Sequence, residues 1–182
     1  MSVIDEETLF LINFVQIFLK NNVDIDTIKE LKSIDTSDIY YGNVAEIVDY
    51  IKQADPDKLY EELNFDFVNL FVHPKDFTTF PIASYHISEN KTLVSKITEE
   101  LKLEYLNENF VLDNSFPYKE DHIVCILEFI KFLDDKDRSE KIIKNYLLPW
   151  LGNFADAICK NAQTFVYRKI GEILKTIETN LV

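Results

Sequence analysis

The chain has 182 residues, which is enough for one sizeable domain but short for two. A hydrophobic fraction of 47% with only 3 Gly and 5 Pro argues against a turn-rich all-β protein and favours long helices. The formal net charge of −13 offers no basic footprint for phosphate groups, so nucleic acid is not expected as a partner.

Apolar residues recur at helical spacing along most of the chain, which predicts an all-α fold of about eight or nine helices. Ser2 or Asp5 is expected to cap the first helix, and Asp55 before Pro56 marks another helix start. Pro149 either interrupts a helix or forms the first turn of the next one. The predicted helices cover residues 5–21, 26–32, 43–51, 56–71, 91–104, 121–133, 139–148, 149–160 and 162–179.

Two irregular stretches, residues 73–90 and 107–119, separate these helices. The first is long for a loop in a compact domain, and such loops are often functional. Residues 77–85 are the best strand candidate, but the prolines around them argue against a strand. Because no repeat, low-complexity tract or linker divides the chain, residues 1–182 are predicted to form a single domain.

The cysteines and the N-terminal residues indicate the compartment. Cys125 and Cys159 lie far apart on predicted helices and belong to no metal-spaced set, so buried free thiols in a reducing cytoplasm are expected. Residues 1–7 are acidic where a signal peptide would be basic. The apolar run 9–19 is too short to span a bilayer. We therefore expect a soluble cytoplasmic protein without stable membrane insertion.

Asp121 and His122 are the adjacent titratable side chains with the most distinctive position, since a loop turns into an amphipathic helix there. An acid and an imidazole at a helix start either cap the helix or hold a ligand. Asp121 is expected to be the N-cap of this helix, and His122 to hydrogen-bond a backbone carbonyl. The alternative is a helical metal-dependent hydrolase that uses both side chains, although the three histidines are scattered and no HExxH motif is present.

Sequence motifs give no further support to catalysis. No phosphate-binding glycine loop and no GxSxG motif occur, so no catalytic residue, metal or cofactor is predicted. Two apolar clusters stand out instead, residues 67–71 and residues 147–154. Core packing accounts for the first. In the second, Trp150 and Phe154 are four residues apart and should share one pocket.

Three segments, taken in order, resemble the TorD/DmsD family of molybdoenzyme chaperones, which is related to the NarJ type. The matching residues are Leu70-Phe71 with Pro81 and Ser84-Tyr85, then Glu120-Asp121-His122-Ile123, and finally Leu148-Pro149-Trp150 with Phe154. The resemblance spans about residues 60–160. Two positions depart from the family pattern: Glu120 stands close to where a proline is frequent, and Ala83 replaces a residue that is commonly acidic or small and polar.

The resemblance implies a cytoplasmic chaperone that is not an enzyme. Such proteins bind the twin-arginine signal peptide of a molybdoenzyme catalytic subunit and delay its export until the molybdenum cofactor is inserted. A NarJ-type assembly factor for a nitrate reductase is the alternative within the same class. The family includes domain-swapped dimers, so the resemblance leaves a monomer or such a dimer open, together with the client and any guanine-nucleotide binding.

The resemblance also suggests which residues form the peptide site. Arginine favours bidentate contacts with carboxylates, so Asp121 and Glu120 would face the two arginines while His122 orients the acidic loop. An acidic surface in general favours such cationic partners. The apolar part of the peptide would lie in a groove between helices. The predicted peptide-binding residues are Leu70, Phe71, Pro81, Ser84, Tyr85, Glu120, Asp121 and His122.

Overall fold

The computed structural model describes residues 4–39, 41–74, 78–112 and 117–182, and within these ranges it contains helices and no strand. The predicted all-α class is confirmed. The α-helices are α1 (Glu6–Leu19), α2 (Ile25–Ser33), α3 (Gly42–Gln53), α4 (Pro56–Phe67), α5 (Ala83–Ile87), α6 (Lys96–Asn107), α7 (Ile123–Phe132), α8 (Lys136–Ile142), α9 (Leu148–Asn161) and α10 (Phe165–Leu181). A 3-10 turn (Thr36–Asp38) and two π-helical turns, η2 (Val68–Val72) and η3 (Ile143–Leu147), complete the order.

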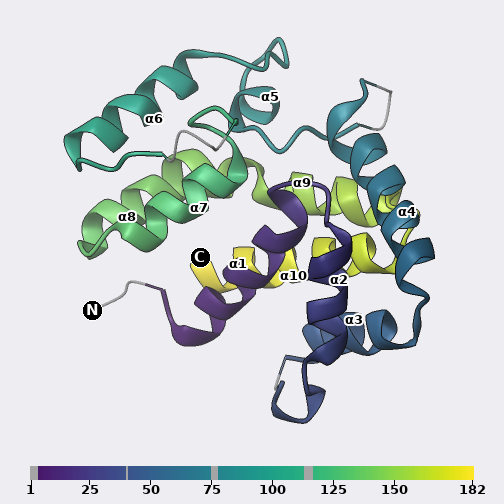
Figure 1. Cartoon of the computed structure of the whole chain (residues 1–182). Coiled ribbons are helices and arrows are strands. Elements are labelled where there is room, and N and C mark those ends of the chain that lie inside the picture. Colours follow the sequence, from purple (N-terminus) through teal and green to yellow (C-terminus); the bar gives the residue numbers. More distant parts are fainter. Residues whose placement is uncertain (1–3, 40, 75–77, 113–116) are drawn as a thin grey trace.

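Helices α9 and α10 pack along each other, and α1 lies across α10 on the face seen in Figure 1. On one side α2 and α3 pack together, with α4 beside α2. On the other side lie α5 to α8, where α5 contacts both α6 and α9. The buried apolar side chains form one continuous cluster that reaches from α1 to α10.

Aspartate side chains begin several of these helices by accepting a hydrogen bond from a backbone N–H of the first turn. The carboxylates of Asp5, Asp24, Asp55 and Asp135 cap α1, α2, α4 and α8 in this way. Each such cap contributes about 1 kcal/mol to helix stability. The predicted caps at Asp5 and Asp55 are confirmed, while Ser2 lies outside the described residues. Part of the excess of acidic residues therefore stabilises the starts of helices.

Three elements differ from the prediction, and one of them is α6, which begins at Lys96 rather than at residue 91 because Ser95 caps it there. α5 lies inside the stretch 73–90 that was expected to be a loop. α8 begins at Lys136 rather than at Ser139, because Asp135 accepts from Arg138 N at 2.9 Å and caps the earlier start. At Pro149 both predicted alternatives hold, since α9 carries the proline in its first turn and the turn before it is π-helical. Proline lacks an N–H and crowds the carbonyl four residues earlier, which a wider turn relieves.

Within the described part of the chain, no helix combines the length and the apolar character needed to cross a membrane.

Gly171 lies where α10 approaches α9 closely, and it yields a stability prediction. A Cβ added there would lie 2.6 Å from Cys159 Sγ and 3.0 Å from the Ala155 carbonyl oxygen. We expect Gly171→Ala to lower the free energy of unfolding by about 1–3 kcal/mol, because overpacking outweighs the better helix propensity of alanine. Gly42→Ala is the matched control, since an added Cβ there meets nothing within 4 Å. Urea unfolding of both variants tests this, and equal midpoints would contradict it.

Candidate functional site

Two segments that carry predicted site residues pair with each other through their backbones. Ala83 N donates to the Asp121 carbonyl oxygen at 2.9 Å, and Ile123 N donates to the Pro81 carbonyl oxygen at 2.8 Å. Ile82 and His122 thereby form an isolated antiparallel bridge. In the described part of the predicted strand candidate 77–85, the extended pairing is confined to this bridge, while Phe77 lies outside the described residues.

The Asp121 carboxylate caps α5 and not the helix that follows it. Its Oδ2 accepts a hydrogen bond from Ser84 N at 2.9 Å, and α5 has no side-chain cap from its own N-cap residue, Ile82. The expectation that Asp121 is the N-cap of α7 is therefore wrong. His122 is that N-cap, and its Nδ1 accepts from Val124 N at 3.2 Å. The backbone pairing explains the exchange, because it places Asp121 at the start of α5.

The Ser84 hydroxyl extends this contact to α6. It lies 2.8 Å from Ser95 Oγ and 3.0 Å from Thr98 Oγ1, the two side chains of the capping box at the start of α6. We call Asp121, Ser84, Ser95 and Thr98 the capping network. It joins the starts of α5, α6 and α7 through side chains that are mostly buried, and such networks stabilise one arrangement when their members are hydrogen-bonded.

His122 is almost completely buried, with 2% of its surface exposed. Its ring stacks on Tyr118 with centroids 4.2 Å apart. Burial lowers the pKa of His122 from its usual 6.5 to about 3, so the ring is neutral near pH 7. Its Nδ1 accepts a hydrogen bond from the backbone, and only a neutral imidazole ring has a nitrogen that can accept one.

An aromatic cluster joins the remaining motif segments. His86 of α5 stacks on Trp150 of α9 with centroids 4.8 Å apart, and Phe71 of η2 lies 6.0 Å from Phe154. Trp150 and Phe154 are themselves 5.4 Å apart and both buried, which confirms their predicted shared pocket. The Leu70 carbonyl oxygen accepts from a backbone N–H of the loop that leads to Pro81. The structure thus brings all the motif segments together.

Most of the predicted peptide-binding residues are inaccessible in this structure. Asp121 and Ser84 have no exposed surface, and the same is true of Leu70. Partial exposure remains at Tyr85 and Glu120. The buried members of the predicted set are Leu70, Phe71, Pro81, Ser84, Asp121 and His122. In this structure the Asp121 carboxylate is not exposed to a peptide arginine, and it accepts from the backbone at the start of α5.

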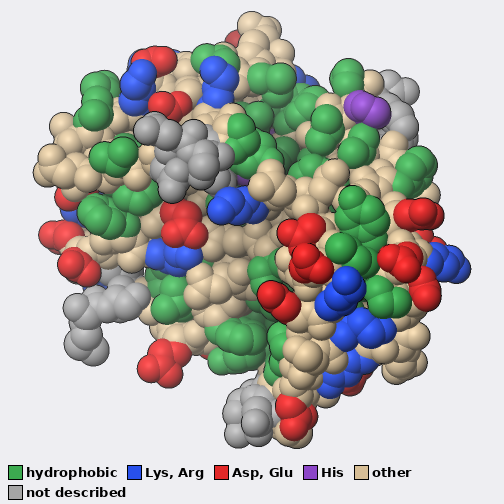
Figure 2. All heavy atoms as spheres, in the orientation of Figure 1, with side chains coloured by type: hydrophobic (Ala, Val, Ile, Leu, Met, Phe, Trp, Pro, Cys, Tyr) green, Lys and Arg blue, Asp and Glu red, His purple; other side chains and the backbone are tan. Residues whose placement is uncertain are grey.

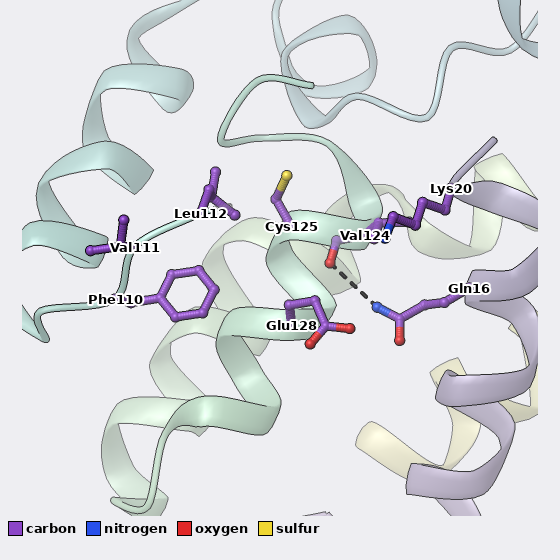
Figure 3. Close-up of a pocket in the computed structure, with 8 residues that line it drawn as sticks. All are labelled: Gln16, Lys20, Phe110, Val111, Leu112, Val124, Cys125 and Glu128. Carbon is purple, nitrogen blue, oxygen red and sulfur yellow. Dashed lines mark hydrogen bonds between the residues drawn. The ribbon is translucent and has the colours of Figure 1, made fainter. Parts of the chain in front are cut away.

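A cavity of about 270 Å³ opens on the other side of α7, between α1 and residues 110–112 (Figure 3). Gln16 and Lys20 line it from α1, and Gln16 Nε2 donates to the Val124 carbonyl oxygen at 3.4 Å. Cys125 and Glu128 line it from α7. Its polar groups include both an ammonium and a carboxylate, and its lining includes none of the predicted site residues.

Among the described residues, no group of three or more His, Cys, Asp or Glu side chains is arranged to hold a metal ion. Asp121 Oδ2 and His122 Nδ1 each accept a backbone hydrogen bond instead.

Sequence reasoning missed two further polar contacts. The S-x-x-T pattern of Ser95 and Thr98 is close to a capping box and could have been found. Asp66 gave no local indication. Thr164 is the N-cap of α10, and the carboxylate of Asp66 on α4 holds Thr164 in place. It accepts from Thr164 N at 2.8 Å and from Gln163 N at 3.0 Å. Like Asp121, this buried acid accepts from backbone N–H groups that are distant from it in sequence.

The chain is similar to known proteins, and the family match includes the capping network. A family model described as nitrate reductase delta subunit matches residues 40–156. The chaperone protein TorD of Vibrio parahaemolyticus serotype O3:K6 (strain RIMD 2210633) is 27% identical over 128 residues. That alignment covers 62% of this chain and 59% of the relative, so the chain spans little more than half the length of the curated protein it matches.

Removal of the Asp121 carboxylate tests its role as a cap. We expect Asp121→Ala to lower the free energy of unfolding by about 1–3 kcal/mol, because the buried Ser84 N–H loses its partner. Asp121→Asn retains an acceptor and should lose less. Asp24→Ala is the control, since it removes an exposed cap worth about 1 kcal/mol. Chemical denaturation measures all three, and an Asp121→Ala loss no greater than that of the control would contradict the buried cap.

The buried neutral His122 predicts a pH dependence of stability. Between pH 6.5 and about 3 the unfolded state gains a proton that the folded state does not bind, so stability falls as the pH falls. We expect this to cost up to about 1.4 kcal/mol per pH unit. His122→Asn retains a capping oxygen and removes the titration, so its stability should fall less steeply.

Denaturation of wild type and His122→Asn between about pH 7 and pH 4 measures this difference, within the window set by the two pKa values. His73→Asn serves as the control at an exposed histidine. Parallel pH profiles for wild type and His122→Asn would show that the imidazole is not held neutral.

Proposed function

The chain belongs to the nitrate reductase delta subunit family, the family of the TorD/NarJ-type molybdoenzyme chaperones, and from this premise we propose that it assists the maturation of a molybdenum-containing oxidoreductase. In this proposal residues 1–182 act as one binding unit in the cytoplasm. The unit binds the twin-arginine signal peptide of the catalytic subunit and releases it for export once the enzyme is complete. No bond is made or broken by the chaperone.

The single observation that carries the proposal is the family match over residues 40–156, which includes all eight predicted site positions. The similarity to a protein named as a TorD chaperone supports the same class. The net charge of −13 is of the opposite sign to a peptide that begins with two arginines, so it would speed their encounter.

The eight predicted residues have two roles in this proposal. Tyr85 and Glu120 have the exposure that a direct contact with the client protein requires. The other six position the framework, since Asp121 and Ser84 belong to the capping network and Phe71 to the aromatic cluster.

A NarJ-type assembly factor is the second candidate, because the matching family model is described as a nitrate reductase delta subunit. Such a factor would act on a nitrate reductase subunit that is not exported in the usual way. Co-purification of tagged chain with untagged host proteins distinguishes the candidates. Recovery of a subunit with a twin-arginine leader favours the first, and recovery of a nitrate reductase subunit without one favours the second.

A synthetic leader with two consecutive arginines and a following apolar run tests the proposed function directly. We expect it to bind the wild-type chain, and to bind more weakly when both arginines are replaced by glutamine. The affinity should also fall between about 0.1 M and about 1 M salt, because the Debye length shrinks from about 10 Å to about 3 Å. Isothermal titration calorimetry measures both effects. Absence of binding, or equal affinity for the two leaders, would overturn the proposal.

A further inference from the structure

An almost entirely apolar groove runs between α1 and the residues around the end of α2. It encloses about 280 Å³ and is lined chiefly by Phe10, Phe14, Ile17, Leu31, Ile34 and Ile39. We call it the α1–α2 groove. It lies outside the region that joins the motif segments, and all six of these residues precede the stretch matched by the family model.

Large apolar side chains are exposed around this groove. Phe10 is 38% exposed, Ile17 is 36% exposed and Ile34 is 39% exposed. Figure 2 shows hydrophobic side chains gathered low on this face, above the turn that joins α2 to α3. Exposed apolar side chains that surround one hollow are typical of a surface that binds a partner.

The end of the groove at the start of α1 is acidic. The Phe10 ring lies 4.9 Å from the Tyr41 ring, and Tyr41 together with Glu7 lines a second hollow of about 240 Å³. Partial burial and the negative charges of Glu7, Asp5 and Glu6 raise the pKa of the Tyr41 phenol. No lysine or arginine of the described chain forms an ion pair with Glu6 or Glu7.

Among the described residues that line the groove none is charged, and Asn13 is the polar one. Lys131 Nζ lies 2.9 Å from Asn13 Oδ1, but its charge is paired with Glu128 Oε1 at 2.7 Å. A cationic segment would therefore be attracted to the Glu7 end of the groove.

The geometry points to the α1–α2 groove as the docking surface for the leader peptide, with its two arginines at Glu6 and Glu7 and its apolar run beside Phe10, Ile17 and Ile34. This assignment rests on the proposed function. Residues 7 to 17 of α1 span about 15 Å, the length of about ten residues of a helical leader. The leader would thus lie as a helix in a groove, parallel to α1.

The cavity of Figure 3 does not fit the same ligand. Lys20 lines it, so an arginine pair would meet a like charge there, and Glu128 is already bound by Lys131 at 2.7 Å. The α1–α2 groove has an acidic end and an apolar floor, which is the order of charge and apolar residues in a twin-arginine leader. Helices α1 and α2 lie before residue 40, where the family match begins. A leader that docks there would contact residues outside this match, which would let this chain select its own client.

Calorimetric titration of the leader against surface variants tests the assignment. We expect Ile17→Gln and Ile34→Gln to weaken binding by about tenfold each, because each removes apolar area that the leader would cover. Glu7→Gln should weaken binding by about threefold at low salt, and the difference should vanish at high salt. Leu103→Gln and Glu99→Gln are matched controls on α6, one an exposed leucine and the other an exposed glutamate in the first turn of a helix.

The outcomes separate the groove from the function. Binding by wild type that falls in the groove variants and not in the α6 controls supports the assignment, provided that thermal melts show all variants folded. Binding that is equal in all of them leaves the proposed function standing and overturns the groove. No binding by wild type overturns both. A wild-type dimer, seen by light scattering, that the groove variants dissociate would make the groove an interface between two copies and overturn its assignment to the leader.

Discussion

The hydrogen bond from Ser84 N to the Asp121 carboxylate is the contact on which the arrangement of this protein depends. Asp121, which directly precedes the N-cap residue of α7, caps the start of α5. The two bonded residues are 37 positions apart in the sequence. Through the Ser84 hydroxyl the same contact reaches the start of α6. Once α5 is fixed, His86 stacks on Trp150 and links this side of the molecule to α9. A buried backbone N–H is costly to leave without a partner, so the contact favours one packing of these helices.

Framework and docking surface are separate in this account. The residues that mark the family resemblance lie at helix starts and in an aromatic cluster, where most are buried. Asp66 also holds a remote segment, since its buried carboxylate accepts from the N–H of Thr164, the N-cap residue of α10. The groove assigned to the leader lies elsewhere, along α1 and the end of α2.

The features that local sequence determines were predictable, and those that depend on distant partners were not. The helix periodicity and the caps at Asp5 and Asp55 follow from nearby residues and are confirmed. The helix α5 was missed because its cap is supplied by Asp121. Sequence reasoning predicted the first helix, residues 5–21, from the spacing of its apolar residues alone. It did not single out Phe10, Phe14 and Ile17 on another face of that helix. Apolar residues on several faces of a helix indicate that more than one face makes packing or binding contacts.

The most direct test of this division is a titration of ¹⁵N-labelled protein with the twin-arginine leader, followed by the backbone amide resonances. The account predicts that the resonances of Phe10, Ile17, Ile34 and Tyr41 move as the leader is added. It also predicts that those of Ser84 and Ile123, whose N–H groups are held by Asp121 and Pro81, stay in place. Large shifts at Ser84 and Ile123 with none along α1 would contradict it, and would indicate that the leader binds at the motif residues.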